Sequence, residues 1–265
     1  MLKKPFDYLR FGYMPSFSMD LISEIKFAKK HFDFIEITLK LNLAEYTKKY
    51  LNRLKKILDN FEILGHIHWD IDLTKKTGTK KILENIEIYK FLGARKITIH
   101  PFARKGISRE KTLRNNCRVL KYLASFCKKK GLQLLVESCS FTPFNLAKYF
   151  KYLLAKNSLL SITLDVGHTN SVSQKELENF LALFSKKIQH IHLHYNCNGV
   201  DHLPFLQKDK EKLKWTLNKL NNLKRKLTVD LEIFTTLKKQ QPTPINSGQR
   251  PKLLLNQLKF IEKLK

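Results

Sequence analysis

Two patterns of apolar and polar positions alternate along the chain. Short apolar, β-rich runs are followed by longer segments of helical period, and this pairing occurs eight times. The runs predict strands at residues 11–15, 32–39, 61–68, 96–101, 132–138, 159–165, 188–194 and 226–234. The longer segments predict helices at residues 20–30, 43–60, 80–92, 109–130, 144–156, 174–184, 208–223 and 251–264. Several strands are almost continuously apolar, which is typical of strands covered on both faces.

Strand–helix units in series predict a parallel sheet. A (β/α)8 barrel needs about 250 residues, and the chain has 265. We therefore expect residues 1–265 to form one α/β domain, a single (β/α)8 TIM barrel, with a doubly wound sheet as the alternative. The segment 238–250 contains proline, glutamine and glycine, and we expect it to be a long loop after the eighth strand.

The composition is that of a folded chain with a large core. Hydrophobic residues make up 43% of it, which argues against long disordered regions. It has no run of about 18 uncharged apolar residues, so no membrane span is predicted. The first residues lack the apolar segment of a secretory signal. The four cysteines form no CxxC pair, and a reduced, cytoplasmic location is expected.

The charge is strongly positive and leaves the partner open. Lysine and arginine total 50 against 23 acidic residues, a formal net charge of +27. Such a balance suits a polyanion such as nucleic acid. Only nine of the basic residues are arginine, the residue that reads phosphates and bases with two parallel hydrogen bonds. Scattered lysines can equally be a solvated surface, so the charge alone does not decide.

Histidine and carboxylate side chains gather at the carboxyl ends of the predicted strands. In a barrel these ends carry the catalytic groups, and imidazole with carboxylate suits zinc, manganese and similar divalent metals. The pattern therefore predicts a shared metal site, with Trp69 as a candidate wall of the pocket. The residues concerned are His66, His68, His100, Glu137, Asp165, His168, His192, His194 and Glu232.

Six segments carry a family likeness. They are GHIHWDIDL (65–73), ITIHP (97–101), LLVES (134–138), LDVGH (164–168), HIHLHYNCNGVDHLP (190–204) and LEIF (231–234). In these segments the chain resembles the xylose isomerase-like TIM barrel superfamily. That superfamily joins sugar (phosphate) isomerases and epimerases with the endonuclease IV type of apurinic-site nuclease, AP endonuclease family 2.

The resemblance implies specific roles for these residues. In the nuclease branch, histidines equivalent to His66, His100, His168 and His202 hold further metals, whereas in the isomerase branch His168 contacts the substrate. His68 is an alternative to His66 in this alignment. His66, His100, His168, Trp69 and Lys105 are the candidate substrate-binding residues. The shared metal ligands would be Glu137, Asp165, His192 and Glu232.

The chain also departs from the family pattern. The family has an aspartate two residues before the histidine of the seventh loop, where this chain has Val200, with Asp201 one place away. An acid of the seventh strand is replaced near His194. The loop after the third predicted strand carries Asp70 and Asp72, which would repel DNA phosphates. These differences weaken the nuclease interpretation.

Three functions follow as hypotheses. The first is a sugar (phosphate) isomerase or epimerase with one Mn, Zn or Co ion and an enediolate mechanism. In it Glu137 and Glu232 move the proton, His168 holds a substrate oxygen, and Lys105 with Arg104 either meets a phosphate or is simply solvated. The second is a phosphodiesterase acting on abasic DNA with up to three metals. The third is a barrel that binds a ligand without catalysis. The oligomeric state, including a homo-oligomer, stays open.

Overall fold

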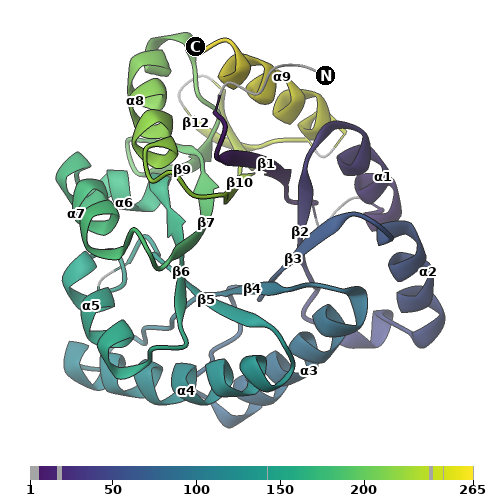
Figure 1. The fold of residues 1–265 in the computed structure, drawn as a ribbon, viewed down its shortest axis with the longest axis vertical. Helices are drawn as coiled ribbons and strands as arrows, with labels where there is room; N and C mark the ends of the chain where they lie inside the picture. Colours follow the sequence, from purple (N-terminus) through teal and green to yellow (C-terminus); the bar gives the residue numbers. More distant parts are fainter. Residues whose placement is uncertain (1–5, 17–19, 142, 239–240, 247, 265) are drawn as a thin grey trace.

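The protein is a closed barrel of eight parallel strands surrounded by helices (Figure 1). The computed structural model describes residues 6–16, 20–141, 143–238, 241–246 and 248–264. The strands follow the order β1-β10-β7-β6-β5-β4-β3-β2 around the barrel. The prediction of a single (β/α)8 barrel is confirmed, and the doubly wound alternative is wrong, because the sheet closes between β1 and β2.

The barrel strands fall within or close to the predicted runs, and most are shorter. Their inner and outer faces are both covered, so that β6, for example, is buried at every position. Apolar burial of this kind is the main stabilising term of the fold. The strands are β1 Leu9–Tyr13, β2 Phe34–Thr38, β3 Glu62–His66, β4 Lys96–Ile99, β5 Gln133–Glu137, β6 Ser161–Asp165, β7 Ile188–Leu193 and β10 Leu227–Leu231.

The helices pack around the barrel, and several of them begin at residues that the sequence marks as caps. Side-chain oxygens of Asp20, Thr47, Ser108 and Ser173 accept hydrogen bonds from backbone N–H groups in the first turn of α1, α2, α4 and α7. The helices are α1 Leu21–His31, α2 Lys48–Leu58, α3 Lys76–Leu92, α4 Arg109–Lys129, α5 Ala147–Lys156, α6 Val166–Val172, α7 Gln174–Phe184, α8 Lys210–Asn221 and α9 Arg250–Glu262.

Four differences from the predicted elements lie in the connections. The predicted helix at 43–60 is divided into a 3-10 turn, η1 (Leu43–Glu45), and α2; a second 3-10 turn, η2 (Gln207–Asp209), precedes α8. Helix α6 directly follows β6. A hairpin of β8 (Tyr195–Cys197) and β9 (Val200–Leu203) follows β7.

The expected loop at 238–250 is wrong in part. A second hairpin, β11 (Thr235–Lys238) and β12 (Gln241–Pro244), occupies part of it, and residues 239, 240 and 247 of that segment lie outside the described residues.

The barrel interior is polar near its centre. Glu36 on β2 bonds to His190 and His192 on β7, and Thr98 on β4 bonds to Thr163 on β6. Because neither pair of strands is adjacent in the barrel, both contacts cross its interior. An apolar core normally fills this space, so the polar cluster marks the part of the barrel that positions the site. Among the described helices, none is long and apolar enough to cross a membrane.

Candidate functional site

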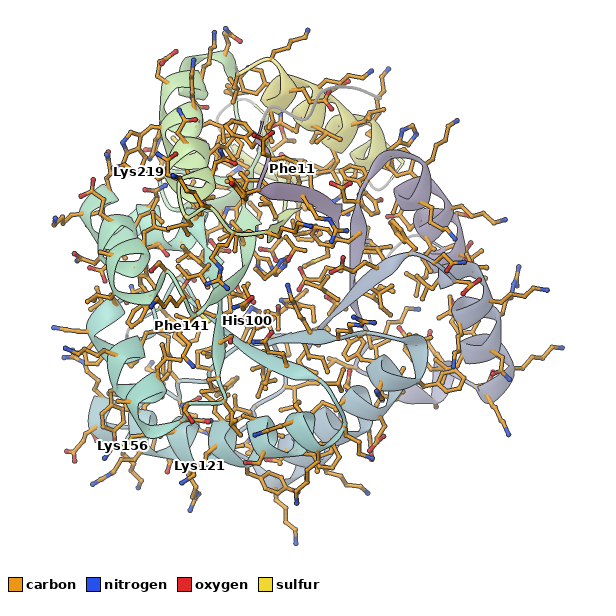
Figure 2. All side chains as sticks on the ribbon, in the orientation of Figure 1. Phe11, His100, Lys121, Phe141, Lys156 and Lys219 are labelled. Atoms are coloured by element: carbon orange, nitrogen blue, oxygen red, sulfur yellow. The ribbon has the colours of Figure 1, made fainter. Side chains whose placement is uncertain are left out.

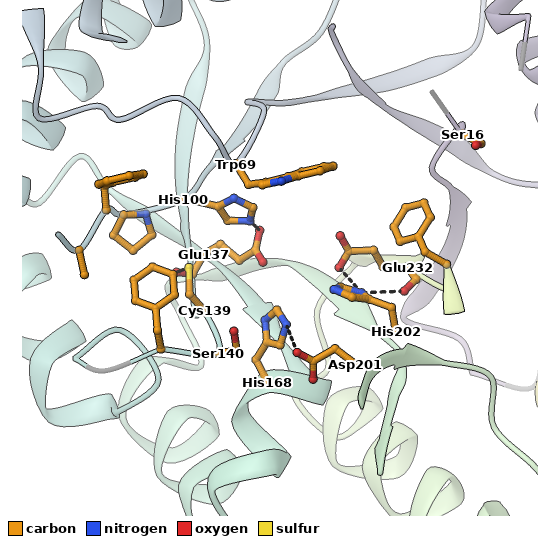
Figure 3. Close-up of a pocket in the computed structure, with 15 residues that line it drawn as sticks. Ser16, Trp69, His100, Glu137, Cys139, Ser140, His168, Asp201, His202 and Glu232 are labelled. Atoms are coloured by element: carbon orange, nitrogen blue, oxygen red, sulfur yellow. Dashed lines mark hydrogen bonds and ion pairs between the residues drawn. The ribbon is translucent and has the colours of Figure 1, made fainter. Parts of the chain in front are cut away.

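A cavity of about 760 Å³ opens at the carboxyl end of the barrel strands (Figure 3). This is the end at which barrel enzymes carry their active sites. In the view of Figure 3, Trp69 lies on one side, His168 and Asp201 lie on the other, and Glu137 and Glu232 lie between them. The lining residues are Ser16, Trp69, His100, Pro101, Phe102, Ala103, Glu137, Cys139, Ser140, Phe141, His168, Asp201, His202, Glu232 and Phe234.

Four buried side chains converge at the base of this cavity. Glu137 ends β5, Asp165 ends β6, His192 lies in β7, and Glu232 directly follows β10. One ligand atom from each lies within 4.8 Å of the others. The strand register explains the convergence, because Asp165 is the direct neighbour of His192 across β6 and β7. The structure thus brings together the four residues that the sequence proposed as metal ligands.

Glu36, on the side of His192 away from the cluster, sets the orientation of the His192 ring. Its Nε2 lies 3.0 Å from Oε2 of Glu36, so this nitrogen carries a proton and donates it to the carboxylate. Its Nδ1 faces the cluster, 3.4 Å from Oε2 of Glu137 and 3.2 Å from Oε2 of Glu232. Among the described residues, neither Nδ1 of His192 nor Oε2 of Glu232 has a hydrogen-bond partner of good geometry, although both are buried.

These atoms fit a divalent cation. Three carboxylates around one imidazole carry excess negative charge in a buried place, and buried charges are stable only when they are paired or bind a metal. Burial would lower the pKa of His192, but Glu232, Glu137 and Glu36 raise it well above its ordinary value. A cation that displaced the proton from Nδ1 would gain the lone pair through which histidine binds metals. Mixed nitrogen and oxygen donors suit zinc, manganese or cobalt. The residues that would hold the ion are Glu137, Asp165, His192 and Glu232.

The acids of the cluster are ionised at neutral pH. Burial by itself would raise the pKa of Glu137, but His100 and His192 outweigh burial and hold that pKa well below its ordinary value. The pKa of Glu232 is lowered in the same way against burial, by His192 and His202. For Asp165, His168 and His194 outweigh burial and lower the pKa.

Two further histidines contact Glu137. Nε2 of His100 lies 2.8 Å from Oε2 of Glu137, and Nε2 of His66 lies 3.4 Å from the same oxygen. His68, the alternative to His66, points elsewhere: its ring stacks on Trp69 with 4.2 Å between the ring centroids. The geometry therefore favours His66 as the histidine of the third strand that belongs to the cluster.

A second group of histidines lies beside Asp165. Nε2 of His194 is 3.0 Å and Nδ1 of His168 is 3.3 Å from Oδ2 of Asp165. The backbone N–H of His202 donates to Nδ1 of His194 at 3.1 Å. His168, His194 and His202 can place ligand atoms within 4.8 Å of one another. Asp201 also lines the cavity, with Oδ2 3.8 Å from Nε2 of His168.

The comparisons with known proteins agree with this fold. A family model described as "Xylose isomerase-like TIM barrel" matches residues 25–264. The chain belongs to this family. A search of curated proteins finds no match to the xylose isomerase-like chain.

Many solved structures share the fold at low sequence identity. A D-allulose 3-epimerase from Methylomonas sp. is 16% identical, with 99% of each chain covered and a TM-score of 0.75. A 3-keto-D-glucoside 4-epimerase from E. coli is 14% identical, with 96% of this chain and 98% of the other covered and a TM-score of 0.73. The IolI protein, solved with a bound zinc atom, is 16% identical, with 97% and 99% covered and a TM-score of 0.70.

Two residues of this xylose isomerase-like site, Glu36 and Asp230, escaped the sequence reasoning, and both are fully buried beneath the cluster. His194, which belongs to the predicted strand-end group, contacts Asp165. Burial and the nearby Glu36 raise the pKa of Asp230 well above its ordinary value. A signal was available in the sequence, because residues two apart on a strand face the same side of the sheet. Glu36 is two residues from Phe34 on β2, and Asp230 is two residues from Glu232, so both acids could be expected to face the barrel interior.

Of the two remaining substrate-binding candidates, Trp69 lies in the cavity lining and Lys105 does not. Trp69 lines the cavity and is 46% exposed, as a pocket wall requires. Lys105 is exposed and lies outside the cavity lining. Its neighbour Arg104 is turned away, with Nε 2.7 Å from Oδ2 of Asp72 and Nη2 2.9 Å from Oγ1 of Thr74.

Proposed function

We propose that the protein is a divalent-metal-dependent isomerase or epimerase that acts on a small sugar. One observation carries the proposal. Glu137 and Glu232 belong to the four-residue donor cluster and also line the cavity, so each carboxylate can face both a cation and a substrate. A pair of carboxylates beside one cation is the arrangement needed to move a proton next to a carbonyl group.

The residues divide the work of proton transfer. Glu137 and Glu232 reach the cavity from β5 and from the end of β10, so one can remove a proton from carbon and the other can return it from another side. Both are ionised, and their low pKa makes them weak bases. When bound at the cluster, a divalent cation would polarise the substrate carbonyl and lower the pKa of the neighbouring C–H. A weak base could then remove this proton.

The histidines at the rim would bind and orient the substrate. His168 lies in the cavity wall, and its backbone N–H donates to Oδ1 of Asp165 at 2.7 Å, which anchors the start of α6. Its ring is thereby held beside the donor cluster, where it can donate to a substrate oxygen. His100 lies on the opposite side, against Glu137. The epimerase relatives, among them a D-allulose 3-epimerase and a 3-keto-D-glucoside 4-epimerase, support a sugar substrate.

Solvent exchange tests the proposal without knowledge of the natural substrate. The metal-loaded protein is incubated in D2O with D-fructose, D-tagatose, D-allulose and D-sorbose, and NMR follows the hydrogen next to the carbonyl. We expect deuterium to enter that position and an epimer or isomer to appear. Glu232→Gln should abolish the exchange, whereas Glu84→Gln, the same change at an exposed position of α3, should not. Exchange at the wild-type rate in Glu232→Gln would refute the role of Glu232.

A metal-dependent phosphodiesterase acting on abasic DNA is the second candidate. Two of the other donor groups beside the four-residue cluster favour it, because this reaction uses two or three metals. They are His66, His100 and Glu137, and His168, His194 and His202. A cleavage assay with abasic and intact duplexes tests it. Preference for the abasic duplex would support the nuclease, whereas equal, salt-sensitive binding of both would report only the lysine-rich surface.

A further inference from the structure

The cavity is far larger than the donor cluster needs. Its volume of about 760 Å³ corresponds to about 25 water molecules in the liquid, whereas a hexose has only 12 non-hydrogen atoms. Pockets of this size bind ligands as large as drug molecules. A substrate that fills the cavity therefore extends well beyond the carbonyl and hydroxyl groups that the acids contact.

The cavity lining also includes aromatic and other apolar side chains. Trp69 and Phe141 are 46% and 38% exposed, and Phe102 and Phe234 are partly buried in the same lining. Exposed aromatic rings that surround a cavity are suited to stacking on apolar or aromatic groups. Exposed apolar groups gathered at a concave site are typical of a ligand-binding surface.

The described lining of the cavity holds no permanently charged cation for a phosphate. Among the described residues that line the cavity, none is a lysine or arginine, although the chain has 50 of them. The labelled Lys121 and Lys156 lie at the periphery of the molecule, whereas His100 lies near the barrel axis (Figure 2). The charged groups of the cavity include Glu137, Asp201 and Glu232, which repel an anion.

Two arginines that adjoin lining residues, Arg104 and Arg250, are engaged in other contacts. Arg104 is held by Asp72 and Thr74 on the neighbouring loop. Arg250 is buried behind Phe234, with its guanidinium carbon 4.2 Å from the ring centroid, and its Nε donates to the backbone carbonyl of Ile233 at 2.8 Å. The N-terminus of α6, the other feature that attracts anions, is capped by Asp165.

We propose that the substrate is an unphosphorylated keto sugar that carries an apolar, aromatic-sized substituent at the end remote from its carbonyl group. The sugar end lies at the donor cluster and the substituent lies against Trp69 and Phe141. This assignment rests on the proposed isomerase or epimerase activity, since it takes the carbonyl to be at the cluster. It specifies the substrate class, which the family does not.

Three derivatives of one ketose test the assignment. D-fructose substituted on O6 with a benzyl, a methyl or a phosphoryl group differs only at the remote end, and the same series is made from D-tagatose and D-allulose. Deuterium exchange gives the specificity constant kcat/KM, and calorimetry on the metal-loaded protein gives affinity. We expect the benzyl ether to exceed the methyl ether at least tenfold in both, and the phosphate to fall below the methyl ether.

Substitutions of the aromatic residues test which side chains cause the preference for the benzyl ether over the methyl ether. Phe141→Ala and Trp69→Ala should each reduce the ratio of benzyl to methyl ether severalfold. Tyr122→Ala, which removes an aromatic ring that is 53% exposed on α4 outside the cavity lining, should leave the ratio unchanged. Circular dichroism confirms that each variant folds.

The possible failures are distinguishable. Exchange with a benzyl-to-methyl ratio near one, or a preference for the phosphate, overturns this assignment and leaves the proposed function intact. Absence of exchange with every ketose, with the benzyl ether still bound at least tenfold more tightly, refutes the proposed function and retains the apolar subsite. Equal or absent binding of the benzyl and methyl ethers overturns the subsite.

Discussion

The carboxylate of Glu36 meets the imidazole of His192 across the barrel interior, with 3.0 Å between Oε2 and Nε2. The same oxygen lies 2.7 Å from Nε2 of His190. Both histidines are fully buried. Glu36 therefore holds a proton on Nε2 of His192 and turns Nδ1 toward Glu137 and Glu232. A partner of this kind raises the basicity of a metal-binding histidine and holds its ring in place.

Glu36→Gln should weaken metal binding without removing a ligand. The neutral amide loses the charge that stabilises the Nε2–H of His192, and loss of such a partner typically costs about 10–100-fold in metal affinity. Competition with a chelator measures the affinity for Co²⁺, and the visible spectrum of bound Co²⁺ reports the ligand geometry. Glu84→Gln, on the exposed face of α3, serves as the control. Unchanged Co²⁺ affinity and spectrum in Glu36→Gln would show that Glu36 only supports the barrel.

The sequence was sufficient to predict the barrel because the information is local. Each strand is a short apolar run, and each helix shows the helical period of apolar residues. Few chain topologies can accommodate eight such strand–helix units. The four donors were also accessible to sequence reasoning, since they lie at or next to the carboxyl ends of strands. Glu36 was not, because its contact with His192 depends on closure of the barrel between strands that are far apart in the chain.

The sequence contains a marker of the hairpin of β8 and β9, although this hairpin was not predicted. Asn198 and Gly199, at its turn, have φ angles of 51° and 75°. An Asn-Gly pair is a strong marker of a tight hairpin, because both residues tolerate positive φ. Its strands are only three and four residues long, too short for a hydrophobic period. The hairpin matters because it brings Asp201 and His202 into the cavity lining.

Gly167→Ala should disturb the histidine cluster. A Cβ atom at this position would lie 2.2 Å from Cε1 and 2.4 Å from Nδ1 of His194, so the ring would have to shift from its present position beside Asp165. Overpacking of this kind costs about 1–3 kcal/mol. Chemical denaturation measures the free energy of unfolding. Gly248→Ala is the control, because a Cβ there makes only an ordinary 3.5 Å contact. Equal stability of the two variants would contradict the close approach.

Asp72→Asn should destabilise the protein in a pH-dependent way. Burial alone would raise the pKa of Asp72, but hydrogen bonds from Thr74 and Arg104 lower it below its ordinary value of 3.8. The ionised acid therefore contributes stability above pH 3.8, and this contribution is lost as the pH falls through the lower folded pKa.

Unfolding at several pH values measures this contribution. We expect Asp72→Asn to lose about 1–2 kcal/mol at pH 7 and the difference to shrink under acid. Asp70→Asn is a neighbouring exposed control, with an expected change within about 0.5 kcal/mol. If the difference in free energy of unfolding between wild type and Asp72→Asn stayed constant across the pH range, ionised Asp72 would not be the source of the stabilisation.

Metal removal should destabilise the wild-type protein. A cation that binds only the folded state adds about 2.7 kcal/mol when its free concentration is a hundred times its Kd. Thermal unfolding with EDTA and with excess Mn²⁺ or Co²⁺ measures the difference. Glu232→Gln replaces an anionic donor with a neutral amide and should reduce the metal-dependent shift in Tm, whereas Glu84→Gln should retain it. An identical shift in Glu232→Gln would place the metal elsewhere.

His202→Asn should separate the two candidate functions by metal content. His202 has a φ of 59°, and asparagine tolerates this left-handed conformation better than alanine does, so the backbone of the hairpin is retained. If the four-residue cluster holds the only ion, elemental analysis should give about one equivalent of metal in both wild type and variant. If His168, His194 and His202 hold another, the variant should lose that equivalent, which would favour the phosphodiesterase. Asn198→Asp, in the turn of the same hairpin, is a control for changes in the loop itself.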